Sequence, residues 1–109
     1  MEIRFDQKSK AMRVMLDGEI DHHCALDTRI EIDSQIKQLQ PKRLILDYGE
    51  VTFMDSSGIG LIMGRHRLMQ SLGGTIEVAN VPDRLYKVIK LAGIEKLGKV
   101  STAGNGGIK

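Results

Sequence analysis

The chain has 109 residues, 41% of them hydrophobic and 28% charged, with a net charge of +2. That length suits one domain with one core, and the composition excludes disordered and collagen-like classes. The sequence also lacks the Lys- and Arg-rich runs of nucleic-acid binders, the apolar stretch of a membrane span or signal peptide, and the second cysteine of an internal disulfide, so we expect a cytoplasmic protein.

The N-terminal residues predict a β-hairpin. Apolar and polar residues nearly alternate through residues 1–16, with a polar stretch around Ser9 in the middle, which is typical of two paired strands. Asp17 and Gly18 are residue types that favour turns, so we expect the second strand to end there.

A helix and a buried strand are predicted next. Asp21 is a suitable cap for the helix, and Pro41 ends it. The apolar stripe along this helix consists of Ala25, Ile32, Ile36 and Leu39. Residues 43–47 are a short apolar run of the kind found in strands buried on both faces, and residues 48–50 predict a turn after them.

The second half of the chain alternates helices with strands. Residues 59–74 predict a helix that its final pair of glycines closes, and residues 75–79 predict a strand. A further helix begins near Pro82 and is ended by Gly93, before a last short strand at 99–101. The apolar positions of that helix are Leu85, Val88, Ile89 and Ala92.

This order of elements predicts the fold class. It indicates a single α/β domain whose mixed sheet of four to five strands is covered by helices, in the order ββαβαβα. Connections between parallel strands of such a sheet are expected to be right-handed. The domain is predicted to occupy residues 1–101, and the glycine-rich residues 102–109 are expected to form a flexible tail.

The segment at residues 53–64 (FMDSSGIGLIMG) carries the most informative chemistry, because a strand end meets a helix start there. The first backbone N–H groups of a helix lack internal partners, and its dipole leaves that end partly positive. A serine hydroxyl at this point can accept a phosphate, which the helix end then stabilises. Asp55, Ser56 and Ser57 are also good capping residues, so capping alone would account for them.

Three glycines distinguish this helix from an ordinary capped helix. Gly58, Gly60 and Gly64 each cost about 1 kcal/mol of helix stability relative to alanine. Glycines that lower helix stability in this way need an explanation, and close approach of another chain or a ligand to the helix is one. We therefore expect this turn to bind a partner.

Together with two further segments, GEIDHHCA at 18–25 and LGGTIEVANV at 72–81, this stretch resembles the STAS domain of bacterial anti-sigma factor antagonists. The resemblance runs from the N-terminal hairpin to about Val100, with the motifs in the family's order and spacing. It is strongest to members that act in the sporulation of spore-forming bacteria. The fold that it implies is the mixed α/β domain expected from the element order.

The resemblance implies a phosphorylation switch. The family's phosphorylated serine follows the aspartate of the DSSG motif, which is Ser56 in this chain, and an acidic residue near the switch corresponds to Asp21. In the family, the unphosphorylated protein binds an anti-sigma factor and so frees a sigma factor. That anti-sigma factor is also a serine kinase, and a separate phosphatase reverses its action.

The chain is then a ligand and a substrate of its partners, so we expect no catalysis, no cofactor and no metal. Direct contact with nucleic acid or membrane is not expected either. The predicted partner surface surrounds the switch serine and comprises Asp21, Asp55, Ser57, Gly58, Ile59, Gly60 and Met63.

Other kinds of site fit parts of the sequence. Gly58, Gly60 and Gly64 form a GxGxxxG pattern at a helix start, so a small nucleotide-binding domain is the main alternative, although the chain is short for a dinucleotide fold. Residues 21–24 (DHHC) include metal-ligand types, but neighbours on a helix point in different directions. Asp47 at a strand end resembles a phosphoacceptor aspartate, without the acidic pair that such a site needs on an earlier strand.

The apolar residues of the predicted helix at 59–74 nearly encircle it. Burial between the sheet and a neighbouring helix accounts for most of them, whereas exposed methionines would suit an adaptable interface beside Ser56. The residues concerned are Leu61, Met63, Leu68 and Met69.

Overall fold

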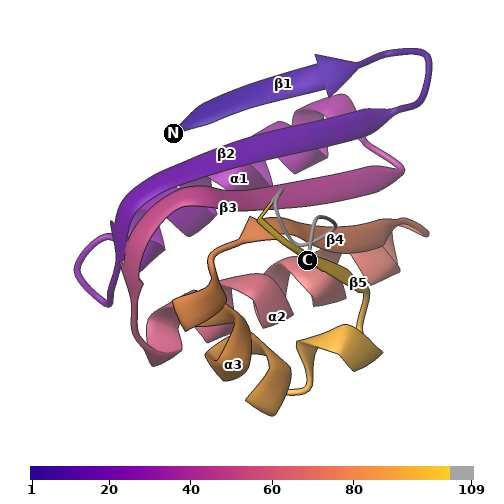
Figure 1. Ribbon diagram of the computed structural model, residues 1–109. Helices are drawn as coiled ribbons and strands as arrows, with labels where there is room; N and C mark the ends of the chain where they lie inside the picture. The colour runs from indigo at the N-terminus through magenta and orange to yellow at the C-terminus, as the bar shows by residue number, and fades with distance from the viewer. Residues whose placement is uncertain (104–109) are drawn as a thin grey trace.

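Five strands form one mixed sheet in the computed structural model, which describes residues 1–103 (Figure 1). The elements in chain order are β1 (Glu2–Asp6), β2 (Ala11–Ile20), α1 (Ala25–Leu39), β3 (Arg43–Met54), α2 (Ser56–Ser71), β4 (Thr75–Val81), α3 (Asp83–Leu91), the short 3-10 helix η1 (Ile94–Lys96) and β5 (Lys99–Thr102). β1 pairs with β2 in antiparallel fashion, and the strands from β2 to β5 are parallel and lie in sequence order. The predicted fold class is confirmed.

The parallel strands follow one another without a change of direction across the sheet. Right-handed connections between such neighbours place the helices on the same face of the sheet. Figure 1 shows α1 and α2 behind the strands. The hydrophobic core lies between the two layers, where alternate strand residues meet the buried stripes of the helices. The fully buried side chains include Met12, Val14, Ile32, Ile36, Leu44, Leu46, Ile62, Met69, Ile76 and Ile89.

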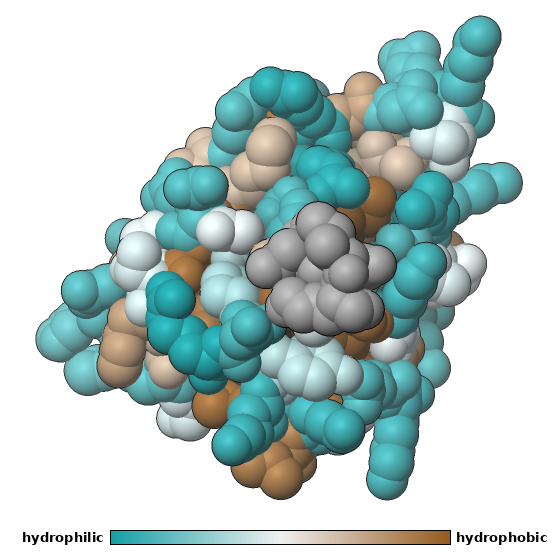
Figure 2. Space-filling view, viewed as in Figure 1, coloured by the Kyte–Doolittle hydropathy of each residue, from teal (hydrophilic) through white to brown (hydrophobic). Residues whose placement is uncertain are grey.

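The opposite face of the sheet is largely hydrophilic, as Figure 2 shows in the same view. Strand residues that point away from the helices form cross-strand ion pairs there. Arg13 of β2 reaches Asp47 of β3 at 2.7 Å, and Arg43 of β3 reaches Glu77 of β4 at 2.8 Å. Alternation of buried and paired side chains therefore fixes which face of each strand meets the core.

The prediction of a turn at residues 48–50 is wrong, because β3 continues through these residues to Met54. Two irregularities in its pairing with β2 each leave an extra residue on β3, so the strand bends without ending. β4 pairs with β3 only as far as Asp47, and the Arg84 side chain donates to the carbonyl oxygens of Val51 and Thr52 beyond it, at 3.1 Å each. Polar turn residues here mark bulges in a long strand.

β2 also extends beyond the predicted turn at Asp17 and Gly18, and it ends at Ile20. Gly18 has a φ of 69°, which favours glycine, and it lies at one of the pairing irregularities. Gly18 therefore adopts the backbone conformation of a turn residue, but it only bends β2, and the pairing of β2 with β3 continues to Ile20.

The helix boundaries differ from the predicted ones by small amounts that have physical causes. The N-cap of α1 is Cys24, because Asp21 lies one turn earlier and organises the loop before the helix. Pro82 is the N-cap of α3, so it precedes the first helical turn. Of the apolar residues of α3, Leu85 and Ile89 form its buried stripe, whereas Val88 is exposed.

The C-terminal strand β5 ends at Thr102, and the backbone N–H of Ala103 donates to the carbonyl oxygen of Val81 at 2.9 Å. The rest of the flexible tail predicted at 102–109 lies outside the described residues. Within residues 1–103, no helix has both the length and the apolar character needed to cross a bilayer.

Candidate functional site

The candidate site lies where two parallel strands end side by side. β2 ends at Ile20 and β3 at Met54, and these two residues are partners in the register of the sheet. The backbone N–H of Asp55 donates to the carbonyl oxygen of Ile20 at 3.3 Å. The loop after β2 and the helix start after β3 are therefore held together at the carboxyl ends of the strands, where folds of this type bind their ligands and partners.

Asp55 caps the start of α2. Its Oδ1 accepts a hydrogen bond from the backbone N–H of Ser57 at 2.8 Å, as an N-cap side chain does. Ser56 is the first residue of α2 and its side chain is exposed, whereas Ser57 is half-buried. Ser56 thus presents a free hydroxyl at the electropositive end of a 16-residue helix, where an added phosphate is favoured electrostatically.

The three glycines of α2 have different surroundings in the structure. Gly58 is buried, and a Cβ at this position would overlap the side chain of Met54, so packing inside the chain accounts for it. A Cβ at Gly60 or at Gly64 would meet open space. Only these two glycines leave room for another molecule, and Gly60 is the exposed one.

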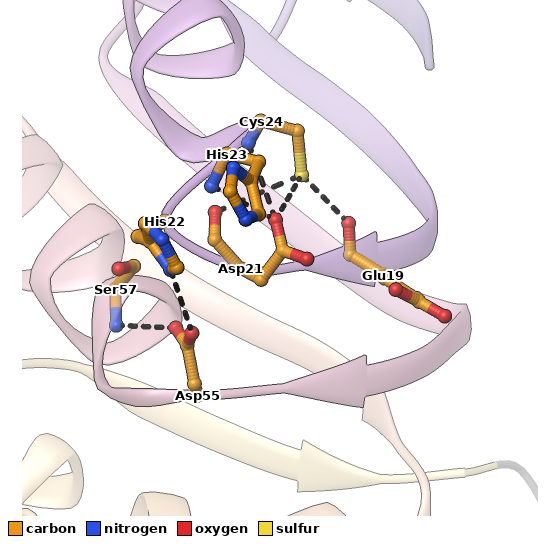
Figure 3. A network of polar contacts seen from close by, with 7 residues as sticks. All are labelled: Glu19, Asp21, His22, His23, Cys24, Asp55 and Ser57. Atoms are coloured by element: carbon orange, nitrogen blue, oxygen red, sulfur yellow. Dashed lines mark hydrogen bonds and ion pairs between the residues drawn. The ribbon is translucent and has the colours of Figure 1, made fainter.

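Asp21 organises the loop between β2 and α1, as Figure 3 shows. Its Oδ1 accepts hydrogen bonds from the backbone N–H groups of His23 at 3.0 Å and of Cys24 at 3.3 Å. The Cys24 thiol donates to the Glu19 carbonyl oxygen at 2.9 Å and approaches Asp21 Oδ1 at 3.4 Å. The Asp21 carboxylate and the Cys24 thiol therefore both stabilise the loop that joins β2 to α1.

The pKa of Asp21 lies below its ordinary value. Partial burial raises this pKa, but the hydrogen bonds from the Cys24 thiol and from the His23 and Cys24 amides, with the charge of His23, lower it by more in total. Since the folded pKa is depressed, the loop hydrogen bonds are fully present above the unfolded value of 3.8 and are lost only as pH falls through the lower folded value.

We expect the backbone amide shifts of His23 and Cys24 to report one titration with a midpoint below 3.8, measured by two-dimensional NMR from pH 7 to pH 2. The Asp21→Asn variant is the control, because it keeps the shape of the side chain and removes the titrating group. A midpoint at or above 3.8 in the wild type, or an unchanged curve in the variant, contradicts this assignment.

His22 connects the two halves of the site. Its Nδ1 lies 3.9 Å from Asp55 Oδ2, and its ring stacks on that of His23 with centroids 4.0 Å apart (Figure 3). Both imidazoles are exposed. The side chains of the DHHC segment thus turn to different partners, and no group of three or more His, Cys, Asp or Glu side chains in residues 1–103 is arranged to hold a metal ion.

The remaining predicted site residues lie along α2. Ile59 and Met63 are half-buried and pack against the core, so only part of each side chain is exposed. Of the two alternatives for the apolar residues around this helix, burial is the one that the structure shows. Leu61 and Met69 are buried, and Met63 and Leu68 are partly buried against the core. The structure therefore brings together Asp21, Asp55, Ser56 and Ser57 with the exposed Gly60.

The other candidate sites are occupied by internal contacts. The backbone N–H of Gly58 donates to the Asp55 carbonyl oxygen at 2.9 Å, so this amide is not free to bind a nucleotide phosphate. Asp47 lies on the open face of the sheet, where Arg13 at 2.7 Å and the Asn80 amide at 2.9 Å pair with its Oδ2.

Sequence reasoning missed a surface beside the site. Leu26 and Ile30 of α1 are large apolar residues with exposed side chains, and Arg29 lies between them in sequence. The signal was present, because both apolar residues fall outside the buried stripe formed by Ile32 and Ile36. Leu26 borders a hollow that Ser57 and Gly60 also line, and Ile30 borders a second hollow that shares Arg29 with the first.

Comparison with known proteins gives a consistent result. The family model of the STAS domain matches residues 2–103. A relative named anti-sigma F factor antagonist from Paenibacillus polymyxa is 31% identical over 97 residues, which cover 89% of this chain and 83% of the relative. The anti-sigma-B factor antagonist of Bacillus subtilis strain 168 is 27% identical and is matched over the full length of both chains.

Solved structures agree with the sequence comparisons. The anti-sigma factor antagonist SpoIIAA in its unphosphorylated form superimposes with a TM-score of 0.70 at 27% identity, over 93% of this chain and 86% of that one. The phosphorylated form of SpoIIAA, described as a Bacillus cell fate determinant, gives a TM-score of 0.69 at 27% identity, over 93% and 92% of the two chains.

Proposed function

Because this chain belongs to the STAS domain family and is an anti-sigma factor antagonist, we propose that Ser56 is the residue whose phosphorylation switches its binding off. The unphosphorylated protein binds an anti-sigma factor and so frees a sigma factor to join RNA polymerase. We propose further that this anti-sigma factor is the serine kinase that modifies Ser56, that a serine phosphatase restores the hydroxyl, and that the cycle takes place in the cytoplasm.

One observation carries the assignment to Ser56: its hydroxyl is exposed at the first position of α2, directly after the capping Asp55, whose backbone contacts the end of β2. The helix end stabilises an added phosphate by only about 0.3–1 kcal/mol at an exposed position. That is enough for the free protein to carry the phosphate. A partner that covers this surface would have to bury about −1.5 to −2 additional charges beside the Asp55 carboxylate, which costs far more.

The test is to purify every anti-sigma factor with a serine kinase domain that the source genome encodes and to incubate each with this chain and ATP. We expect one of them to bind the unmodified chain and to transfer one phosphate, which mass spectrometry then maps to Ser56. Ser56→Ala is the control, because it should bind and remain unmodified. Modification at Ser57 or elsewhere contradicts the assignment, and the partner that responds identifies the type of sigma factor, including whether it is the sporulation type.

A further inference from the structure

A groove runs along the outer surface between α1 and α2, beginning beside the switch. Its first part is a hollow of about 330 Å³, lined by His22, Ala25, Leu26, Arg29, Ser57, Gly60 and Leu61. A second hollow of about 480 Å³ shares Arg29 with the first and continues past Ile30 to Lys37 and Arg65. The groove therefore leads from the start of α2 along both helices.

The apolar part of the groove has no partner within the described chain. The side chains of Leu26 and Ile30 are 52% and 54% exposed, although they lie one helical turn apart on the same helix as the buried Ile32 and Ile36. Neighbouring exposed apolar side chains that border a concave surface are typical of a protein-binding site. Gly60 forms part of the opposite wall and leaves open space where a side chain would stand.

The charged part of the groove is mainly basic. Arg29 and Lys37 are exposed along it, and His22 stands at its beginning. Asp33 is the acidic residue among the side chains that line the two hollows, and its carboxylate is already paired with Arg65 at 2.7 Å. The free charge of the groove is thus positive, which complements a segment with acidic and apolar side chains.

We propose that this groove is the docking site for an acidic, amphipathic segment of the anti-sigma factor, an inference that rests on the proposed function and deepens it. The groove is continuous with the switch, because Ser57, the neighbour of Ser56, lines its first hollow. A phosphate on Ser56 then stands at the mouth of a site that receives negative charge. Repulsion between the phosphate and the acidic segment gives the modification a direct route to releasing the partner.

The experiment compares binding of groove variants and matched surface variants to the anti-sigma factor kinase that the panel above identifies, by isothermal titration calorimetry. Arg29→Glu and Ile30→Ser are expected to weaken binding at least roughly 10-fold each, as truncated or reversed interface contacts do. Lys90→Glu and Leu91→Ser on α3 make the same change of charge and a similar loss of apolar surface at exposed positions outside the groove, and they should bind as the wild type does.

Gly60→Ala separates binding from folding. Within the described residues, the added methyl group contacts no other segment, and it replaces a helix-destabilising residue, so Tm should rise. The same methyl group narrows the groove, so affinity should fall by roughly threefold or more. Weaker binding by a more stable protein cannot be explained by loss of structure.

The outcomes distinguish this inference from the proposed function. If the wild type binds no member of the panel, the proposed function fails. If the wild type binds and is released by phosphorylation of Ser56, but the groove variants bind as tightly as the α3 variants, the groove is not the docking site. A wild-type dimer in sedimentation that Arg29→Glu dissociates assigns the groove to a second copy of this chain, which also overturns the inference.

Discussion

We expect Ser56→Asp to weaken binding to the anti-sigma factor roughly 100-fold, a loss of about 3 kcal/mol, because it places a fixed negative charge beside Asp55 on the surface that we propose the partner covers. Ser56→Ala removes only an exposed hydroxyl and should bind within about twofold of the wild type. The phosphorylated wild type carries more charge than the Asp variant and should bind more weakly still. Calorimetric titration of the three forms measures these differences.

Ser101→Asp is the matched control for charge, because Ser101 is an exposed serine on the edge strand β5 and not at the start of α2. It adds the same charge and should leave the affinity unchanged. Equal affinities for the Ser56→Asp and Ser56→Ala variants would remove the electrostatic basis of the switch, even if Ser56 were modified by a kinase.

The sheet and the order of its elements could be predicted because they depend on local pattern. Near alternation at Met12, Val14 and Leu16 predicts a strand with one buried face, and the structure buries all three. The helix after residue 55 could be predicted, with Asp55 among its candidate caps, although the structure begins α2 at Ser56 instead of at the predicted residue 59. The capping interaction of Asp55 spans only two residues. Contacts between residues so close in the chain can be inferred from the sequence alone.

Features that depend on distant partners could not be predicted in the same way. The extension of β3 through residues 48–54 requires β2 alongside it and the Arg84 side chain to satisfy two of its carbonyl oxygens. Gly58 looked like a site of approach for another molecule, but the atom that excludes a side chain there belongs to Met54 of the same chain. Ile30 falls outside the apolar stripe predicted from the sequence, but only the packing of α1 on the sheet shows that no other described element covers it.

An ion pair between the two helices that form the groove should have the largest single effect on stability. Arg65 of α2 has a side chain only 6% exposed, and its Nε lies 2.7 Å from Oδ1 of Asp33 in α1, whose side chain is 25% exposed. Burial lowers the pKa of Arg65, the Asp33 carboxylate opposes this, and the nearby Arg29 and Arg67 lower the pKa further. The carboxylate is thus the main group that stabilises the buried cation.

Arg65→Met is expected to lower the free energy of unfolding by about 3 kcal/mol, because it leaves the Asp33 carboxylate largely buried without a cation. For a domain of this size the change corresponds to a decrease in Tm of roughly 15 °C, measured by calorimetry or circular dichroism. The pair Arg43 and Glu77 provides the control, since its atoms are equally close at 2.8 Å but the Arg43 side chain is 45% exposed. Arg43→Met should cost less than about 1 kcal/mol.

A double substitution distinguishes an unpaired charge from lost packing. If the cost of Arg65→Met comes from the isolated Asp33 carboxylate, replacing that carboxylate as well, in Arg65→Met with Asp33→Leu, should restore most of the stability. If it comes from the loss of the hydrogen bond that Arg65 Nη1 donates to the Leu61 carbonyl oxygen at 3.3 Å, or from altered packing, the double variant should be no more stable than the single one. Restoration identifies the pair as a constraint on how α1 meets α2, and hence on the shape of the groove beside Ser56.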